Sequence, residues 1–221
     1  MTKYKVIKKL PYRTGPGKSY KKMGVLKKGT LVSVVGSSGK WMKIQKGSKL
    51  YFAHSKNLRP VVNYSRKVGA CVLPLAKRVV KNKSKHESGA YTYKKHRVNC
   101  SVFVSKVLQN AGVLKEGITL YHTSKNHGKG TLNDVAKNRS KVKHYSWHKT
   151  NHRYKNLPKS YKKAGCVYVY ASSIAIVGAD GHIYGCHSSG KTYKKLSMIK
   201  HKGKDYEYTN NILAVGVPKT E

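Results

Sequence analysis

The chain has 221 residues, of which 38% are hydrophobic, enough for one large folded domain or two small ones. It carries 47 Lys and Arg residues against 7 Asp and Glu residues, for a formal net charge of +40. Carboxylates this scarce argue against a two-carboxylate glycosidase. The charge favours a polyanionic partner, for which a teichoic-acid-bearing cell wall, a nucleic acid and an anionic membrane face are the alternatives. A lysine-rich genome would explain the lysines but not the scarcity of acids.

No segment is long and apolar enough to span a bilayer, and residues 1–7 lack the apolar stretch and cleavage site of a secretion signal. The four cysteines form no CxxC pair, so their spacing predicts neither a metal site nor a disulfide framework. Several histidines gather in the polar stretch 122–152 without an HExxH pattern. A zinc site in that stretch is the weaker alternative, and we expect no metal and no cofactor.

Residues from about 4 to 60 alternate short apolar runs with Gly- and Lys-rich turns. Apolar runs at 6–7, 23–26, 31–35 and 41–44 are separated by turns such as Thr-Gly-Pro-Gly and Gly-Ser-Ser-Gly. This spacing predicts a small all-β barrel, and no helical periodicity competes with it.

This segment also resembles the bacterial SH3 family. The resemblance lies in Arg-Thr-Gly-Pro at 13–16, Leu-Lys-Lys-Gly-Thr-Leu-Val at 26–32 and Gly-Lys-Trp-Met-Lys-Ile at 39–44. It implies an SH3-like domain over residues 1–62 that binds cell-wall polymers and does no chemistry. Tyr12, Tyr20, Trp41 and Tyr51 are the candidate wall-binding residues. The alternative is that Trp41 belongs to the core and that the tyrosines are ordinary strand residues.

Residues 60–67 are interpreted as a connector to a second domain spanning 68–221. The segment 71–80 is predicted to be helical, with Leu73, Ala76, Val79 and Val80 on one side. Pro74 is expected in the first turn of that helix, where a missing N–H costs nothing.

The segment 99–112 is predicted to form a helix that begins at a cysteine. Asn99 is a good N-cap, Gly112 is a natural C-terminal stop, and Val104, Val107, Leu108 and Ala111 recur at helical spacing. Cys100 would then lie in the first turn, where free N–H groups and the helix dipole favour a thiolate and an oxyanion. The alternative is a buried structural cysteine.

The Asn-Cys-Ser-Val-Phe-Val run at 99–104 is similar to the Asp-Cys-Ser-Gly-Phe-Val motif of the NlpC/P60 peptidases and related phage amidases. That resemblance implies an α+β papain-like domain with Cys100 as nucleophile, and a flanking tyrosine for which Tyr93 or Tyr91 is the counterpart. The departures are Asn99 for Asp, which keeps the cap, and Val102 for Gly.

The family's catalytic histidine precedes a strand that matches residues 174–177, yet that position is Ser173 here. A serine cannot take the thiol proton near neutral pH. The Ala-Asp-Gly turn at 179–181 predicts a hairpin. If Gly178 pairs with His182, then Ser173 lies opposite His187, and His187 becomes the candidate base. His182 is the next candidate, expected to face solvent.

Together these features predict an endolysin-like peptidoglycan hydrolase, either a cysteine peptidase or an N-acetylmuramoyl-L-alanine amidase. Peptidoglycan and anionic wall polymers are the expected partners, with no nucleic acid and no membrane span, and the protein is expected to be a monomer. It would stay in the host cytoplasm until lysis and then act at the wall, or be secreted by a route that the sequence does not show. The alternatives are an inactive wall-binding protein and a basic nucleic-acid-binding protein.

Overall fold

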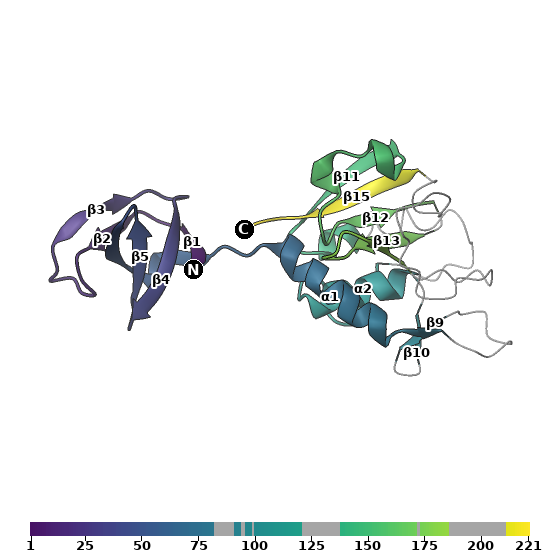
Figure 1. Ribbon diagram of the computed structural model, residues 1–221, viewed down its shortest axis with the longest axis horizontal. Coiled ribbons are helices and arrows are strands. Elements are labelled where there is room, and N and C mark those ends of the chain that lie inside the picture. Colours follow the sequence, from purple (N-terminus) through teal and green to yellow (C-terminus); the bar gives the residue numbers. More distant parts are fainter. Residues whose placement is uncertain (82–90, 94–95, 99, 121–137, 172, 186–210) are drawn as a thin grey trace. The chain divides into compact units, whose positions relative to one another are not determined.

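A computed structural model describes residues 1–81, 91–93, 96–98, 100–120, 138–171, 173–185 and 211–221. The chain divides into two compact units, Met1–Val62 and Asn63–Glu221. Figure 1 labels many of their helices and strands.

The first unit is an all-β fold, as predicted. Its antiparallel sheet has the order β3-β2-β6-β5-β4-β1-β7. The strands are β1 (Thr2–Val6), β2 (Leu10–Arg13), β3 (Lys22–Leu26), β4 (Leu31–Ser38), β5 (Trp41–Lys46), β6 (Lys49–His54) and β7 (Leu58–Pro60), and a short 3₁₀ turn η1 (Ser55–Asn57) joins the last two. The core is small and mainly aliphatic, formed by alternate strand residues such as Val6, Leu10, Ile44 and Ala53, and it also includes the Tyr12 ring.

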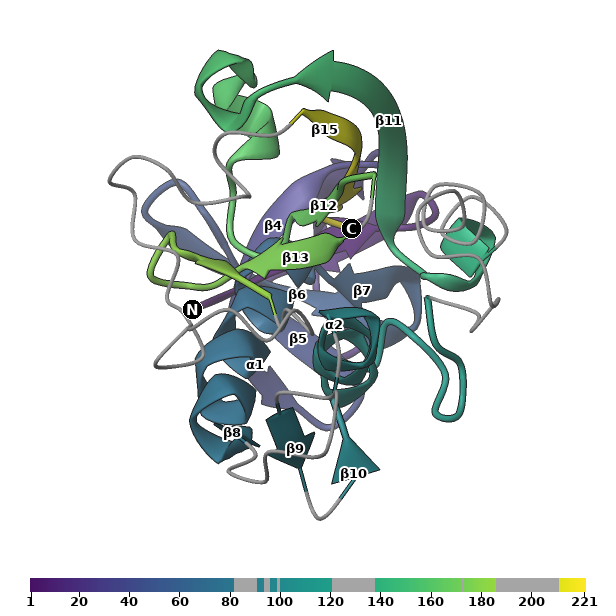
Figure 2. The same ribbon diagram turned by 90° about the vertical axis from the view of Figure 1, so that its right-hand side faces the viewer.

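The second unit is α+β, which confirms the predicted fold class. Its main sheet is antiparallel with the order β11-β15-β12-β13-β14. These strands are β11 (Tyr145–His152), β12 (Val167–Val169), β13 (Ile174–Val177), β14 (Ile183–Tyr184) and β15 (Ile212–Pro218). Helices α1 (Tyr64–Arg78) and α2 (Cys100–Asn110) lie side by side on one face of this sheet, as Figure 2 shows.

Short elements complete this unit. A small sheet of order β10-β9-β8 contains β8 (Val80–Lys81), β9 (Tyr91–Tyr93) and β10 (His96–Arg97). Three 3₁₀ turns are η2 (Arg139–Lys141), η3 (Tyr154–Asn156) and η4 (Lys159–Tyr161). None of the helices in the described residues is long and apolar enough to cross a membrane.

Helix α1 differs from the prediction in its start and in its buried face. It begins at Tyr64, inside the expected connector, because the Asn63 side chain accepts a hydrogen bond from the Arg66 N–H at 3.0 Å and caps it. Pro74 is therefore inside the helix rather than in its first turn. Proline has no N–H, so one carbonyl of the preceding helical turn lacks its usual partner. Because Pro74 is exposed, that carbonyl lies near water. Leu73, expected on the buried side, is 36% exposed.

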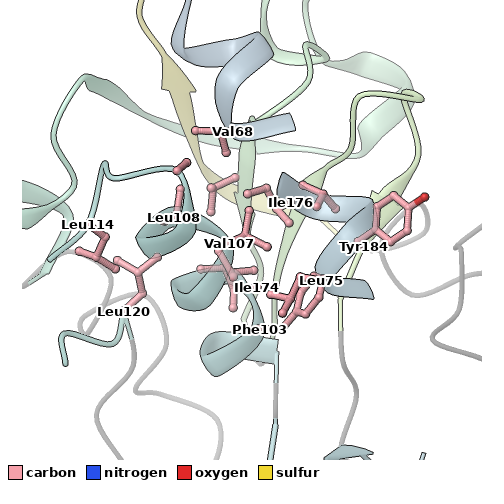
Figure 3. Packing of buried hydrophobic residues seen from close by; sticks show 14 of the residues in the cluster. Val68, Leu75, Phe103, Val107, Leu108, Leu114, Leu120, Ile174, Ile176 and Tyr184 are labelled. Carbon is pink, nitrogen blue, oxygen red and sulfur yellow. The ribbon is translucent and has the colours of Figure 1, made fainter. Parts of the chain in front are cut away.

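Helix α2 forms where it was predicted, and it packs its apolar stripe against the sheet and α1. Phe103, Val107 and Leu108 face Ile174 and Ile176 of β13 in Figure 3. The helix stops at Gly112, whose φ of 68° is the left-handed conformation expected of a C-terminal glycine. This packing fixes the N-terminus of α2 beside the start of β13.

Candidate active site

Cys100 is the first residue of α2, so its sulfur lies where helical N–H groups have no helical partner. The N–H groups of Cys100 itself and of Ser101 both act to lower the pKa of the thiol. The residue is half-buried. The predicted N-cap, Asn99, lies outside the described residues.

The start of β13 supplies the other half of the surroundings of this sulfur. The Ile174 N–H and the Ser173 hydroxyl both favour the thiolate form of Cys100 and so act to lower the pKa of its thiol. Ser173 is 2% exposed, and its hydroxyl has no hydrogen-bond partner of good geometry within the described part of the chain. The Ser173 carbonyl is used, since it accepts the Tyr170 N–H at 2.8 Å. Sequence reasoning missed the contribution of Ile174, because no side-chain pattern reports a backbone donor.

The electrostatic outcome differs from the prediction. Burial raises the pKa of the Cys100 thiol above its ordinary value, and the three N–H groups and the Ser173 hydroxyl offset only part of that effect. The thiol is therefore held neutral near pH 7 by its described surroundings. None of the described histidines contributes to this balance.

The β13–β14 hairpin has the register in which Gly178 pairs with His182, as the assignment of His187 requires. Ile176 pairs with Tyr184, Val177 pairs with Ile183, and the Gly178 N–H donates to the His182 carbonyl at 2.8 Å. His187 itself lies outside the described residues.

His182 lies at the turn of this hairpin, at the opposite end of β13 from Ser173. Five residues of strand separate the two ends, a span of roughly 16 Å. The His182 ring is held at the turn, where its Nδ1 lies 3.2 Å from Asp180 Oδ2. His182 is thus too far from Cys100 to exchange a proton with it.

Asp180 organises that turn. Partial burial disfavours its charge, but hydrogen bonds from the Tyr184 hydroxyl, at 2.5 Å, and from the His182 N–H hold the pKa of the carboxyl below its ordinary value. This cluster fixes the hairpin.

The remaining predicted residues of this unit fall elsewhere. Tyr93 is in β9, opposite His96 in the strand pair, and its side chain lies outside the described residues. The His144 ring stacks on the Tyr64 ring with 3.9 Å between the ring centroids, and the His148 ring stacks on the Tyr161 ring. Within the described ranges, no group of three His, Cys, Asp or Glu residues could hold a metal ion.

The four aromatic residues predicted to bind the wall separate into two kinds. Tyr12 is 8% exposed and belongs to the core, and its hydroxyl accepts a hydrogen bond from Lys46 Nζ at 2.9 Å. Tyr51 packs edge-on against Tyr12. Tyr20 is 48% exposed, and Trp41 is half-buried beside His54. Tyr12 is therefore a core residue, while Tyr20, Trp41 and Tyr51 keep part of their rings at the surface.

Comparison with known proteins identifies the first unit. Residues 2–59 match the family described as bacterial SH3 domain, so the N-terminal unit is a bacterial SH3 domain, as its motifs indicated. No curated protein sequence matches the chain.

Three solved structures are similar to the chain. NlpC2 from Trichomonas vaginalis has 9% identity and a TM-score of 0.32, with 100% of this chain and 73% of that chain covered. NlpC1 from the same organism has 8% identity and a TM-score of 0.31, with 100% of this chain and 69% of that chain covered. An NlpC/P60 family protein from Bacillus cereus has 9% identity and a TM-score of 0.25, with 83% and 54% covered. All three are NlpC or NlpC/P60 proteins by name, the family whose motif the Cys100 segment resembles.

Proposed function

We propose that this protein is a peptidoglycan hydrolase that cleaves an amide bond of the wall peptide with Cys100 as nucleophile. In the first step the sulfur attacks the carbonyl carbon, the C–N bond breaks, and the thiol proton leaves with the amine. In the second step water attacks the thioester, which releases a carboxylate and restores the thiol. No redox partner is needed in either step.

The observation that carries this proposal is that Cys100 begins α2, and that three backbone N–H groups around its sulfur favour the thiolate. Cys100 and Ser101 contribute theirs from the first turn of α2, and Ile174 contributes its own from β13. Donors held rigidly by a helix and a strand stabilise negative charge on sulfur and, when the substrate is bound, on the adjacent carbonyl oxygen.

The raised pKa of the Cys100 thiol means that the reaction needs a proton acceptor. We assign this role to His187. Continued by a few residues, the register that pairs Ile176 with Tyr184 would bring position 187 opposite Ser173, whose hydroxyl adjoins the sulfur. An imidazole there would take the thiol proton and deliver it to the leaving amine.

A second candidate function is wall binding without catalysis. It is favoured by Ser173, which stands where the related peptidases carry their histidine, and by the burial that keeps the Cys100 thiol neutral. In that case the bacterial SH3 domain would be the working part of the chain.

Loss of turbidity of purified Gram-positive cell walls separates the two functions. We expect Cys100→Ala to abolish lysis and Cys71→Ala to leave it unchanged. Cys71 lies in α1, where its thiol donates a hydrogen bond to the Lys67 carbonyl. The matched histidine pair is His187→Ala, which should abolish lysis, and His182→Ala, which should not. Equal lysis by native protein and Cys100→Ala would refute the enzyme.

The remaining parts of the proposal concern the setting. An endolysin-like protein would stay in the host cytoplasm until lysis and then act on the wall as a monomer, held there by its cationic surface. Sedimentation of the purified chain tests whether the protein is a monomer in solution. Analysis of the wall fragments distinguishes the amidase from the peptidase.

A further inference from the structure

The bacterial SH3 domain has a groove at the end where β2, β5 and β6 meet the 3₁₀ turn η1. Its volume is about 390 Å³. We call it the Trp41 groove; it is lined chiefly by Leu10, Arg13, Lys18, Trp41, His54 and Lys56. Its wall thus combines one indole ring, an aliphatic floor and several cationic groups.

The ring pair at this groove is fixed by the strand register. Trp41 and His54 are direct partners across β5 and β6, and their ring centroids are 5.4 Å apart at 67°. The Lys56 N–H donates to His54 Nδ1 at 3.1 Å. Because Nδ1 accepts this bond, the neutral imidazole carries its proton on Nε2, which leaves an N–H available to a ligand.

The charge of the groove has no counterpart in its own domain. Residues 1–62 contain many Lys and Arg residues but no Asp and no Glu. Arg13 Nη1 donates to the Tyr20 carbonyl at 2.8 Å, which orients the guanidinium, while Lys18 and Lys56 are exposed. Cations gathered around a concave surface with no acid nearby attract an anion from outside.

We propose that the Trp41 groove binds a wall polymer made of phosphodiesters joined by polyol units, as in teichoic acids. The inference rests on the proposed function only in taking the wall as the target. Phosphates would pair with Arg13, Lys18 and Lys56, while the C–H groups of the polyol pack on Trp41 and its hydroxyls accept from His54 Nε2. A stacked nucleic acid fits less well, because the Trp41 and His54 rings meet at 67° and do not offer parallel faces to successive bases.

The test measures binding of the full chain to a purified poly(glycerol phosphate) wall polymer freed of peptidoglycan. The groove variant is Lys18→Glu with Lys56→Glu. The matched control is Lys28→Glu with Lys49→Glu, which makes the same change in net charge at exposed lysines that do not line the groove. We expect the groove variant to lose affinity by about tenfold or more and to show a weaker salt dependence, while the control loses less than about threefold.

A second measurement reports on the groove directly. The chain has two tryptophans, Trp41 and Trp147, so emission in a Trp147→Phe background comes from Trp41 alone. Polymer binding should change that emission. A single-stranded DNA of matched phosphate count serves as the competing ligand, with circular dichroism as the check on folding.

Equal losses in the groove and control variants would overturn the assignment, as would a groove-dependent loss for DNA but not for the polymer. These outcomes are independent of catalysis. Lysis that survives Cys100→Ala refutes the hydrolase and leaves the groove standing, whereas polymer affinity that survives Lys18→Glu with Lys56→Glu refutes the groove and leaves the hydrolase standing.

Discussion

Replacing Ser173 with alanine should slow the chemistry of Cys100 without harming the fold. The Ser173 hydroxyl adjoins the Cys100 sulfur and favours the thiolate, so its loss should raise the pKa of a thiol that burial already keeps neutral. A hydroxyl that stabilises a charged neighbour contributes on the order of 1 kcal/mol, so the thiolate population near neutral pH should fall roughly fivefold. Within the described residues this buried hydroxyl has no partner of good geometry, so removing it should leave the free energy of unfolding unchanged or raise it by about 1 kcal/mol.

The assay is alkylation of Cys100 by iodoacetamide, followed by mass spectrometry of its peptide as a function of pH. The plateau at high pH reports access to the sulfur, and the midpoint reports the pKa, so the two effects of the substitution are separated. Cys71, in the same molecule, should react equally in both proteins. A midpoint in Ser173→Ala that stays at the native value or falls below it would refute the role given to this hydroxyl.

Three further substitutions test the structural account. Phe103→Ala should destabilise the second unit by about 3–5 kcal/mol and leave the bacterial SH3 domain unaffected, because Phe103 is 0% exposed at the centre of the α2 packing; urea unfolding followed by each tryptophan separately measures this. Asn63→Ala should cost about 1 kcal/mol by removing the cap that bonds the Arg66 N–H, and Asn63→Asp should retain most of it in the same experiment. Tyr184→Phe should cost about 1 kcal/mol at pH 7. The pKa of the Asp180 carboxyl is lowered in the folded state, so the ionised carboxylate stabilises the fold above the unfolded pKa. This stabilisation is lost as the pH falls through the folded pKa. The free energy of unfolding of Tyr184→Phe should therefore depend less on pH between 7 and 3 than that of the native protein.

The strand pattern of the bacterial SH3 domain and the span of α2 could be predicted because short-range signals determine them. Turn residues punctuate the strands, and the apolar spacing of Val104, Val107 and Leu108 is helical. The start of α1 was predicted too late, because the capping bond from Asn63 is a property of the folded turn and the exposed Pro74 looked like a helix start. Tyr12 could equally have been a surface residue by sequence, and its place in the core, where its ring also meets Tyr51 edge-on, emerges only from the folded structure.

The candidate site was predictable in part. The position of Cys100 at a helix start follows from the cap and periodicity, but its raised pKa depends on how much protein surrounds the sulfur, which no local pattern encodes. The Ile174 N–H is a backbone group from a distant segment, so it emerges only from tertiary structure. His54 could not be identified from the sequence for the same reason, because its place beside Trp41 depends on the pairing of β5 with β6.

The most direct test of the central claim is the chemistry of the products released from purified peptidoglycan. We predict that native protein generates new amino groups without new reducing sugar ends, and that Cys100→Ala generates neither while Cys71→Ala matches the native protein. New reducing ends, or amino groups released equally by Cys100→Ala, would contradict amide cleavage by the Cys100 sulfur.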